Sequence, residues 1–294
     1  MKKILFGLGV VVALNFPVVG NAEIKLDRSN DPFAYTNGWW SNDHRDEIKY
    51  VYSNDYEYLE EIRRESGSDD YNKSGGSNIE IFDNFGFIKR SDLLNLTDTN
   101  GSEGGSSSIE ILQFAENLEY ASLNDRITDF RPLLETKKMK RLDIHSPASS
   151  IHFLKNMSQL EELYLDLASS LDEESSFYPV ISDISILNYL NNLNDVSISS
   201  TKRPFSTISL KKSMDKYVLV NPFILSKQFK NPEVKITSKT PGFTFKDDIL
   251  SWDGIKPETK ELQISWEFKA QKNKYGSYAF YFSGDSVIPI NWID

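Results

Sequence analysis

The sequence of 294 residues contains no cysteine and only three histidines. Disulfide bonds, thiol nucleophiles and zinc sites built on cysteine are therefore excluded. The histidines are His44, His145 and His152, and the repeat described below assigns the last two to different segments of their unit. Because a catalytic or metal site would need them to converge, we expect no enzyme activity, no metal and no cofactor.

Long apolar runs are also missing. A transmembrane helix needs about 20 apolar residues, and the apolar stretch Ile4–Phe16 is shorter. It follows two lysines and precedes the small residues around Gly20-Asn21-Ala22, a pattern that predicts a signal peptide over residues 1–22. The C-terminal segment Ile288–Asp294 carries no wall-anchoring motif. We expect a secreted, extracellular protein without membrane insertion, and the missing disulfides favour a bacterial source.

Basic residues are scarce. Without residues 1–22, 31 Lys and Arg face 43 Asp and Glu, a formal charge of 31 − 43 = −12. Such an excess of negative charge makes nucleic acid an unfavourable partner.

What the sequence does contain is an internal repeat. Leu118, Met139 and Leu160 lie 21 residues apart, and Leu193 and Met214 continue the series after one step of 33 residues. We explain that longer step by an insertion at 169–180. Apolar residues occupy 28 of the 30 aligned positions, where the apolar content of 39% would give about 12, and the exceptions are Lys202 and Ser226.

Each unit predicts one short strand, a turn and a return segment. The inward strand positions are Ala121, Leu142, Leu163, Val196 and Tyr217, then Leu123, Ile144, Leu165, Ile198 and Leu219. The return positions are Ile127, Ala148, Ile181, Lys202 and Phe223, then Phe130, Ile151, Ile184, Phe205 and Ser226, then Leu133, Leu154, Leu187, Ile208 and Phe229. Such units stack, since each buries its apolar edge only against its neighbours.

Three blocks of sequence, in order, resemble the internalin family. Ile127-Thr-Asp-Phe-Arg-Pro-Leu133 and Ile181–Leu187 are similar to its repeat signature, Ser91–Thr97 and Ile109–Leu118 to its junction between cap and first repeat, and Ile249–Trp252, Glu261–Phe268 and Phe282–Ile290 to its Ig-like domain. The resemblance implies an α/β-type solenoid, with a curved parallel sheet of about five to six leucine-rich repeats, a variable N-terminal cap and a C-terminal Ig-like β-sandwich. It also implies that a bacterium uses the protein to bind a host protein, in adhesion or virulence.

We therefore divide the chain into a signal peptide (1–22), an N-terminal cap or variable region (23–108), repeats (109–222) and an Ig-like domain (223–294). Trp252 and Trp266 are expected in the core of that domain, and Phe223 and Phe229 at its junction with the last repeat. The units are one residue shorter than usual in the family, and the position of the family's conserved Asn is taken by Arg126, Pro147, Thr201 and Pro222 in the uninterrupted units. The turns must then satisfy their backbone groups differently.

The residues that flank the inward positions of each strand should project from the concave face of the sheet. They form the predicted partner-binding site: Tyr120, Ser122, Arg141, Asp143, His145, Glu162, Tyr164, Asp166, Asp195 and Lys216. Acids mixed with tyrosines suit a basic or polar protein partner. We expect a monomer that binds a protein through this face.

The N-terminal region leaves an alternative open. Its aromatic segment Tyr35–Trp40 either packs over the first repeat or is itself a binding site, in which case the protein is an envelope-associated factor that binds cell-wall polymer or a bacterial surface partner. A helix is expected at 54–66. Asp70–Gly75 resembles the start of a calcium loop, but Ile81 stands where a bidentate Glu belongs, so we interpret it as an ordinary loop. Thr99–Ser108 is interpreted in the same way, because no Lys follows in the P-loop position.

Overall fold

The computed structural model describes residues 33–35, 50–52, 87–101, 109–124, 127, 129–167, 178–273 and 275–294. The chain divides into residues 1–31, which lie outside these ranges, and residues 32–294, which the following text concerns. The elements, with η for a 3₁₀ helix, are β1 (Phe33–Tyr35), β2 (Tyr50–Tyr52), β3 (Phe87–Lys89), α4 (Arg90–Asn95), β4 (Asp98–Gly101), η4 (Glu110–Phe114), β5 (Tyr120–Asn124), η5 (Arg131–Glu135), β6 (Arg141–His145), η6 (His152–Asn156), β7 (Glu162–Asp166), η8 (Ser185–Tyr189), β8 (Asp195–Thr201), β9 (Ile208–Lys211), β10 (Lys216–Val220), β11 (Glu233–Thr237), β12 (Phe243–Lys246), β13 (Ile249–Asp253), β14 (Glu261–Lys272) and β15 (Tyr278–Ile293).

Several sequence predictions lie outside the described residues. They are the signal peptide 1–22, the helix at 54–66, the loop Asp70–Gly75, and the segment Tyr35–Trp40 beyond Tyr35 itself. Tyr35 ends β1, which pairs in parallel with β2, and β2 pairs antiparallel with β3. Within the described ranges, no helix is long and apolar enough to cross a membrane.

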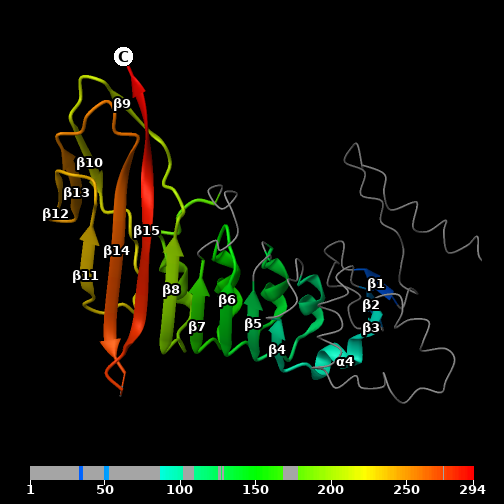
Figure 1. Ribbon diagram of the computed structural model, residues 1–294. Coiled ribbons are helices and arrows are strands. Elements are labelled where there is room, and N and C mark those ends of the chain that lie inside the picture. The colour runs from blue at the N-terminus through cyan, green and yellow to red at the C-terminus, as the bar shows by residue number, and fades with distance from the viewer. Residues whose placement is uncertain are drawn as a thin grey trace, which may run out of the picture. The chain divides into compact units, whose positions relative to one another are not determined.

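Strands β4 to β8 form a parallel sheet in unbroken register (Figure 1). Leu123 lies opposite Ile144, Ile144 opposite Leu165, and Leu165 opposite Ile198, so the predicted stacking of these residues side by side is confirmed. All are buried. Each such side chain contributes about 1.5–3 kcal/mol by leaving water, and it finds apolar neighbours only on the adjacent strands and return segments.

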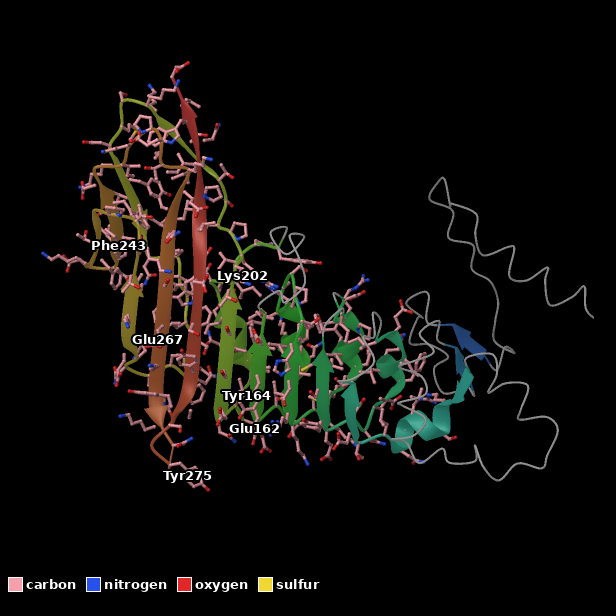
Figure 2. All side chains as sticks on the ribbon, in the orientation of Figure 1. Glu162, Tyr164, Lys202, Phe243, Glu267 and Tyr275 are labelled. Atoms are coloured by element: carbon pink, nitrogen blue, oxygen red, sulfur yellow. The ribbon has the colours of Figure 1, made fainter. Side chains whose placement is uncertain are left out.

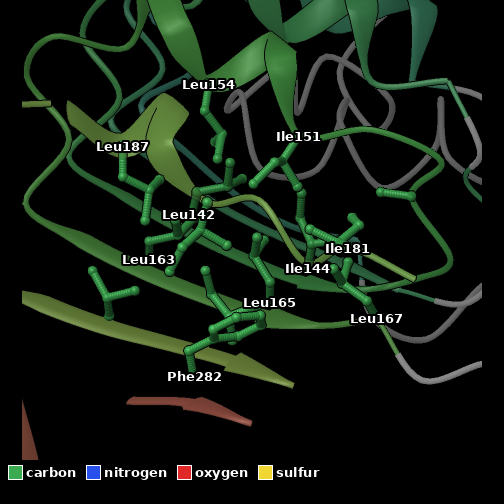
Figure 3. Close-up of a cluster of buried hydrophobic side chains, with 14 of the residues drawn as sticks. Leu142, Ile144, Ile151, Leu154, Leu163, Leu165, Leu167, Ile181, Leu187 and Phe282 are labelled. Atoms are coloured by element: carbon green, nitrogen blue, oxygen red, sulfur yellow. The ribbon is translucent and has the colours of Figure 1, made fainter. Parts of the chain in front are cut away.

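The return segments repeat one local geometry. In η5, η6 and η8, the backbone N–H of Leu133, Leu154 and Leu187 donates to the carbonyl three residues earlier, at Phe130, Ile151 and Ile184. Those leucines and isoleucines are buried beneath the sheet, as the alignment predicted. Figure 3 shows Ile151, Leu154 and Leu187 in one cluster with Leu163, Leu165 and Phe282, a residue of the last strand.

Two side chains donate hydrogen bonds to backbone carbonyls of the turns. The Ser146 hydroxyl donates to the carbonyl of Ile127 in the preceding unit, at 2.8 Å. Arg203, only 1% exposed, donates to the carbonyls of Leu167 (3.0 Å) and Ala148 (2.6 Å). The prediction that groups other than an Asn side chain satisfy the backbone of the turns is confirmed at these positions.

The predicted loop at Thr99–Ser108 is wrong in its first part. Asp98–Gly101 forms β4, a full member of the parallel sheet, with Thr99 opposite Ala121. Thr99 is buried and is followed, after 102–108, by Ile109 and η4. A strand so short and polar, next to glycines and serines, carries too little apolar alternation to be recognised from its sequence.

The predicted fifth repeat is also wrong. Strand β10, which begins at Lys216 of that predicted repeat, pairs antiparallel with β13 in a separate sheet of order β10-β13-β12. The place beside β8 is taken by β15, whose residues 280–285 pair in parallel with Val196–Thr201. The segment 223–229 is nevertheless a return segment: Ile224 bridges Asp183, and the Gln228 amide donates to the carbonyls of Leu187 and Leu190. It is therefore the return segment that follows β8. Lys202, Phe205 and Ile208 lie in the stretch between β8 and β10, where the chain leaves the repeat, and not in a return segment.

The C-terminal part consists of two antiparallel groups of strands, β10-β13-β12 and β11-β14-β15. Trp252 of the first group is buried and donates from its indole to Ser238, whose hydroxyl donates to the Gln263 carbonyl in the second. Trp266 is buried too, so the prediction that both tryptophans lie in the core is confirmed. Because β15 belongs both to this group and to the parallel sheet, one sheet runs from β11 to β4.

Candidate partner-binding face

The sheet β4 to β8 presents one face to its return segments and the other outward. Residues 142, 144, 163, 165, 196 and 198 point to the core, so the residues between them share the outward face. Nine of the ten predicted site residues lie on it: Tyr120, Ser122, Arg141, Asp143, His145, Glu162, Tyr164, Asp166 and Asp195. Their common placement follows from the strand register alone.

The tenth, Lys216, does not lie on this face. It stands on β10 and pairs with Asp253 of β13, its Nζ 2.9 Å from the carboxylate. The prediction that it lies on this face is therefore wrong, because the chain leaves the sheet after β8 and β10 belongs to a different sheet.

Arg141 is the centre of the face. Its guanidinium carbon lies 5.4 Å from the ring centre of Tyr120 and 5.0 Å from that of Tyr164, so it is held between two tyrosines. Its nitrogens also pair with Asp143 at 3.0 Å and Glu162 at 3.2 Å. The hydrogen bond to Asp143 raises the pKa of Arg141, so the guanidinium stays charged.

Negative charge exceeds positive charge around Arg141. Asp98, Asp143, Glu162, Asp166 and Asp195 lie on the outward face, and Arg141 is the one Lys or Arg among its positions in β4 to β8. Burial raises the pKa of Tyr164 to about 12, and the charges of Asp195 and Glu162 act in the same direction. Burial and the charge of Glu162 raise the pKa of Asp195. The face is thus short of positive charge near Asp195.

The face does not end at β8. Tyr164 is opposite Ser197, Ser197 opposite Tyr281 on β15, and Tyr281 opposite Lys269 on β14. Figure 2 shows Tyr164 and Glu162 on β7, and Glu267 on β14. The Tyr281 hydroxyl donates to Glu267 at 3.1 Å, and Lys269 pairs with Glu267 at 2.7 Å.

Tyr281, Lys269 and Glu267 were missed by the sequence prediction. Their alternation with buried Phe268, Ala270 and Phe282 marked them as outward residues. Only the pairing of β15 with β8 places them on the same face as the repeats, and nothing local in the sequence encodes that long-range pairing.

The two histidines of the repeats remain apart. His145 ends β6 at the outward face, whereas His152 begins η6 in the return segment, with its Nδ1 2.9 Å from the Ser150 hydroxyl. Among the residues that the structure describes, no cluster of three or more His, Asp or Glu side chains could hold a metal ion.

The chain is similar to solved structures of Listeria monocytogenes internalins. Internalin C2 is 17% identical over 53% of this chain and 84% of that structure, with a TM-score of 0.36. The internalin InlF is 21% identical over 57% of this chain and 52% of that structure, with a TM-score of 0.35. The functional domain of InlJ is 14% identical over 69% and 50%, with a TM-score of 0.35.

The chain thus spans about half the length of the InlF and InlJ structures. No protein-family model matches it, and no curated protein matches it in sequence.

Proposed function

We propose that this chain is a secreted, non-enzymatic leucine-rich-repeat protein of the internalin type, with an Ig-like C-terminal domain. It binds a protein of the host through the outward face of β5 to β8. The observation that carries the proposal is the position of Arg141 between Tyr120 and Tyr164, within a row of carboxylates on a rigid parallel sheet.

That arrangement suits recognition. Tyrosine and arginine are the side chains most enriched in the energetic centres of protein interfaces. Here their rotamers are already fixed by mutual contacts, so a partner would not have to supply the free energy of ordering them. The excess of carboxylates over the single guanidinium also favours a partner surface with basic groups and would speed its approach.

The test is capture from a lysate of candidate host cells by the immobilised full chain. A face variant with Asp143→Ala, Tyr164→Ala and Asp166→Ala is compared with a matched control, Tyr189→Ala, Asp215→Ala and Glu258→Ala. The control removes the same number of acids and tyrosines at exposed positions away from the face. The proposal expects a protein band that the wild type and the control retain and the face variant loses.

Equal capture by all three proteins would contradict the proposal. If the face variant kept capture but deletion of residues 23–90 abolished it, the binding site would lie in the N-terminal region, as the alternative of an envelope-associated factor requires.

A further inference from the structure

Tyrosines and cations alternate along the outward face, from β5 to the far end of β14. Arg141 lies between the rings of Tyr120 and Tyr164. On the other side, Lys269 lies over the rings of Tyr281 and Tyr278, its Nζ 5.7 and 5.6 Å from their centres. Arg141 and Lys269 therefore each lie against the rings of two tyrosines.

One position in this series has no cation. Tyr164 and Tyr281 both lie directly opposite Ser197, one on each side, and are two strands apart. With about 4.8 Å between neighbouring strands, their backbones are about 10 Å apart. Tyr120 and Tyr164 are also two strands apart and hold Arg141 between them.

The residues between the second pair are small. Ser197 and Ser199 on β8 and Ser283 on β15, here named the serine strip, are partly exposed on the outward face. No described lysine or arginine is placed over the serine strip by any ion pair or ring contact. The interval between Tyr164 and Tyr281 is thus lined by small side chains.

Carboxylates adjoin the serine strip. Asp195 precedes Ser197 by two residues on the same face, and Asp166 is opposite Ser199. Burial raises the pKa of Asp195 and the charge of Glu162 acts in the same direction, while the hydrogen bond from Tyr164 and the charge of Arg141 lower it. A cation above Ser197 would further stabilise the charged form of this carboxylate.

We infer that the interval between Tyr164 and Tyr281 receives an arginine side chain of the protein partner, its guanidinium stacked between the two rings above the serine strip and paired with Asp195. Arginine fits better than lysine, because its planar group stacks on aromatic faces on both sides and binds carboxylates with two nitrogens. This inference rests on the proposed function, since it names the group that the partner presents to the face.

The direct test uses a small probe and the full chain. N-acetyl-L-arginine amide is titrated against the protein and followed through the backbone amide NMR signals of the serine strip. N-acetyl-L-citrulline amide, which has the same shape without the charge, is the matched probe. We expect the arginine compound to bind at least about tenfold more tightly than the citrulline compound, as two cation–π contacts predict. Equal binding of the two compounds would overturn the inference.

Variants locate the site. Ser197→Arg supplies the cation from the chain itself and is expected to abolish binding of the probe, whereas Ser213→Arg, at an exposed turn between β9 and β10, leaves it unchanged. Tyr281→Ala weakens binding, and Tyr281→Phe, which keeps the ring, restores it. The Tyr281 pair gives the answer even if Ser197→Arg does not fold. Binding by Ser197→Arg or Tyr281→Ala as tight as that of the wild type would contradict the assignment.

The outcomes separate this inference from the proposed function. If the face variant loses capture from lysate but Ser197→Arg keeps it, the face binds the partner and the arginine assignment is wrong. If no protein is captured but the arginine probe binds selectively and Ser197→Arg abolishes it, the assignment stands and the proposed function is wrong.

Discussion

Phe282 lies directly opposite Ile198 in parallel register, so a strand from the C-terminal end of the chain occupies the place of the next repeat strand. Both side chains are buried in the same core. The sheet of the repeats and the sheet of the C-terminal part are consequently one structure, and their outward faces are one surface.

Gly284 makes this junction possible. A Cβ at this position would lie 2.0 Å from the backbone oxygen of Ser200 and 2.3 Å from Cζ2 of Trp266, closer than any real contact. Because a backbone atom is involved, the neighbours cannot yield cheaply. We expect Gly284→Ala to lower the free energy of unfolding by about 1–3 kcal/mol or more, measured by urea denaturation. Ser283→Ala, next to it on the outward face, is the control and should change stability by less than about 0.5 kcal/mol.

Phe223 of the return segment 223–229 packs against aromatic residues of the C-terminal part. Its ring centre lies 4.7 Å from that of Trp266 and 5.4 Å from that of Phe268. Phe223→Ala should cost about 3–5 kcal/mol and keep a single transition, with tryptophan fluorescence and circular dichroism changing together. Two separate transitions in the wild type would show that the repeats and the C-terminal part unfold independently and would contradict the shared core. Tyr189→Ala, at an exposed position, should be nearly neutral.

The repeat was predictable because its signal is local and recurs. Three consecutive units at 21-residue spacing place Leu123, Ile144 and Leu165 without knowledge of anything else in the chain. The outward positions of those units follow from the alternation of side chains along a strand, which explains why nine of the ten predicted residues lie on the outward face.

The end of the repeat was not predictable from periodicity alone. Strand β10 has its own apolar alternation at Tyr217 and Leu219, which coincides with the repeat spacing although these residues belong to a different sheet. Lys202, a charged residue at an apolar position, is a local indication that the repeat ends. There the chain turns with a φ of 58° and leaves the repeat. Whether β10 or β15 pairs with β8 depends on contacts between residues that are more than 80 positions apart in the sequence, and no local pattern encodes such contacts.

Arg203 supports two turns of neighbouring repeats at once. Its bonds to the carbonyls of Ala148 and Leu167 satisfy backbone groups of both turns. Burial lowers the pKa of Arg203 to about 10, which reflects the cost of its charge in the interior. Arg203→Met removes that cost but leaves two carbonyls without their donors, at about 1–3 kcal/mol each.

We therefore expect a net loss of about 2 kcal/mol for Arg203→Met, measured by thermal or urea unfolding. Ser146→Ala, which removes a single bond of the same kind, should cost about 1 kcal/mol. A more stable Arg203→Met protein would show that the buried charge outweighs the bonds.

Tyr164 should ionise about two pH units above an ordinary tyrosine, with a pKa of about 12. Since the folded pKa lies above the unfolded value of 10, the stability that this group contributes is complete below pH 10 and is lost as pH rises through 12. Ultraviolet titration of the phenolate, with Tyr164→Phe as the reference, measures it. Asp195→Asn should lower this pKa and Arg141→Gln should raise it. The opposite order would contradict the electrostatic account of the face.

Side-chain footprinting of the protein with and without its captured partner tests the binding face most directly. Tyr120 and Tyr164 should become protected together from chemical labelling, and Tyr281 with them if the partner reaches across the serine strip. Tyr189 and Tyr275, which are 56% and 80% exposed and lie outside β5 to β8, should be labelled as before. Protection of Tyr189 or Tyr275 with unchanged labelling of Tyr120 and Tyr164 would contradict the assignment of the outward face as the binding site.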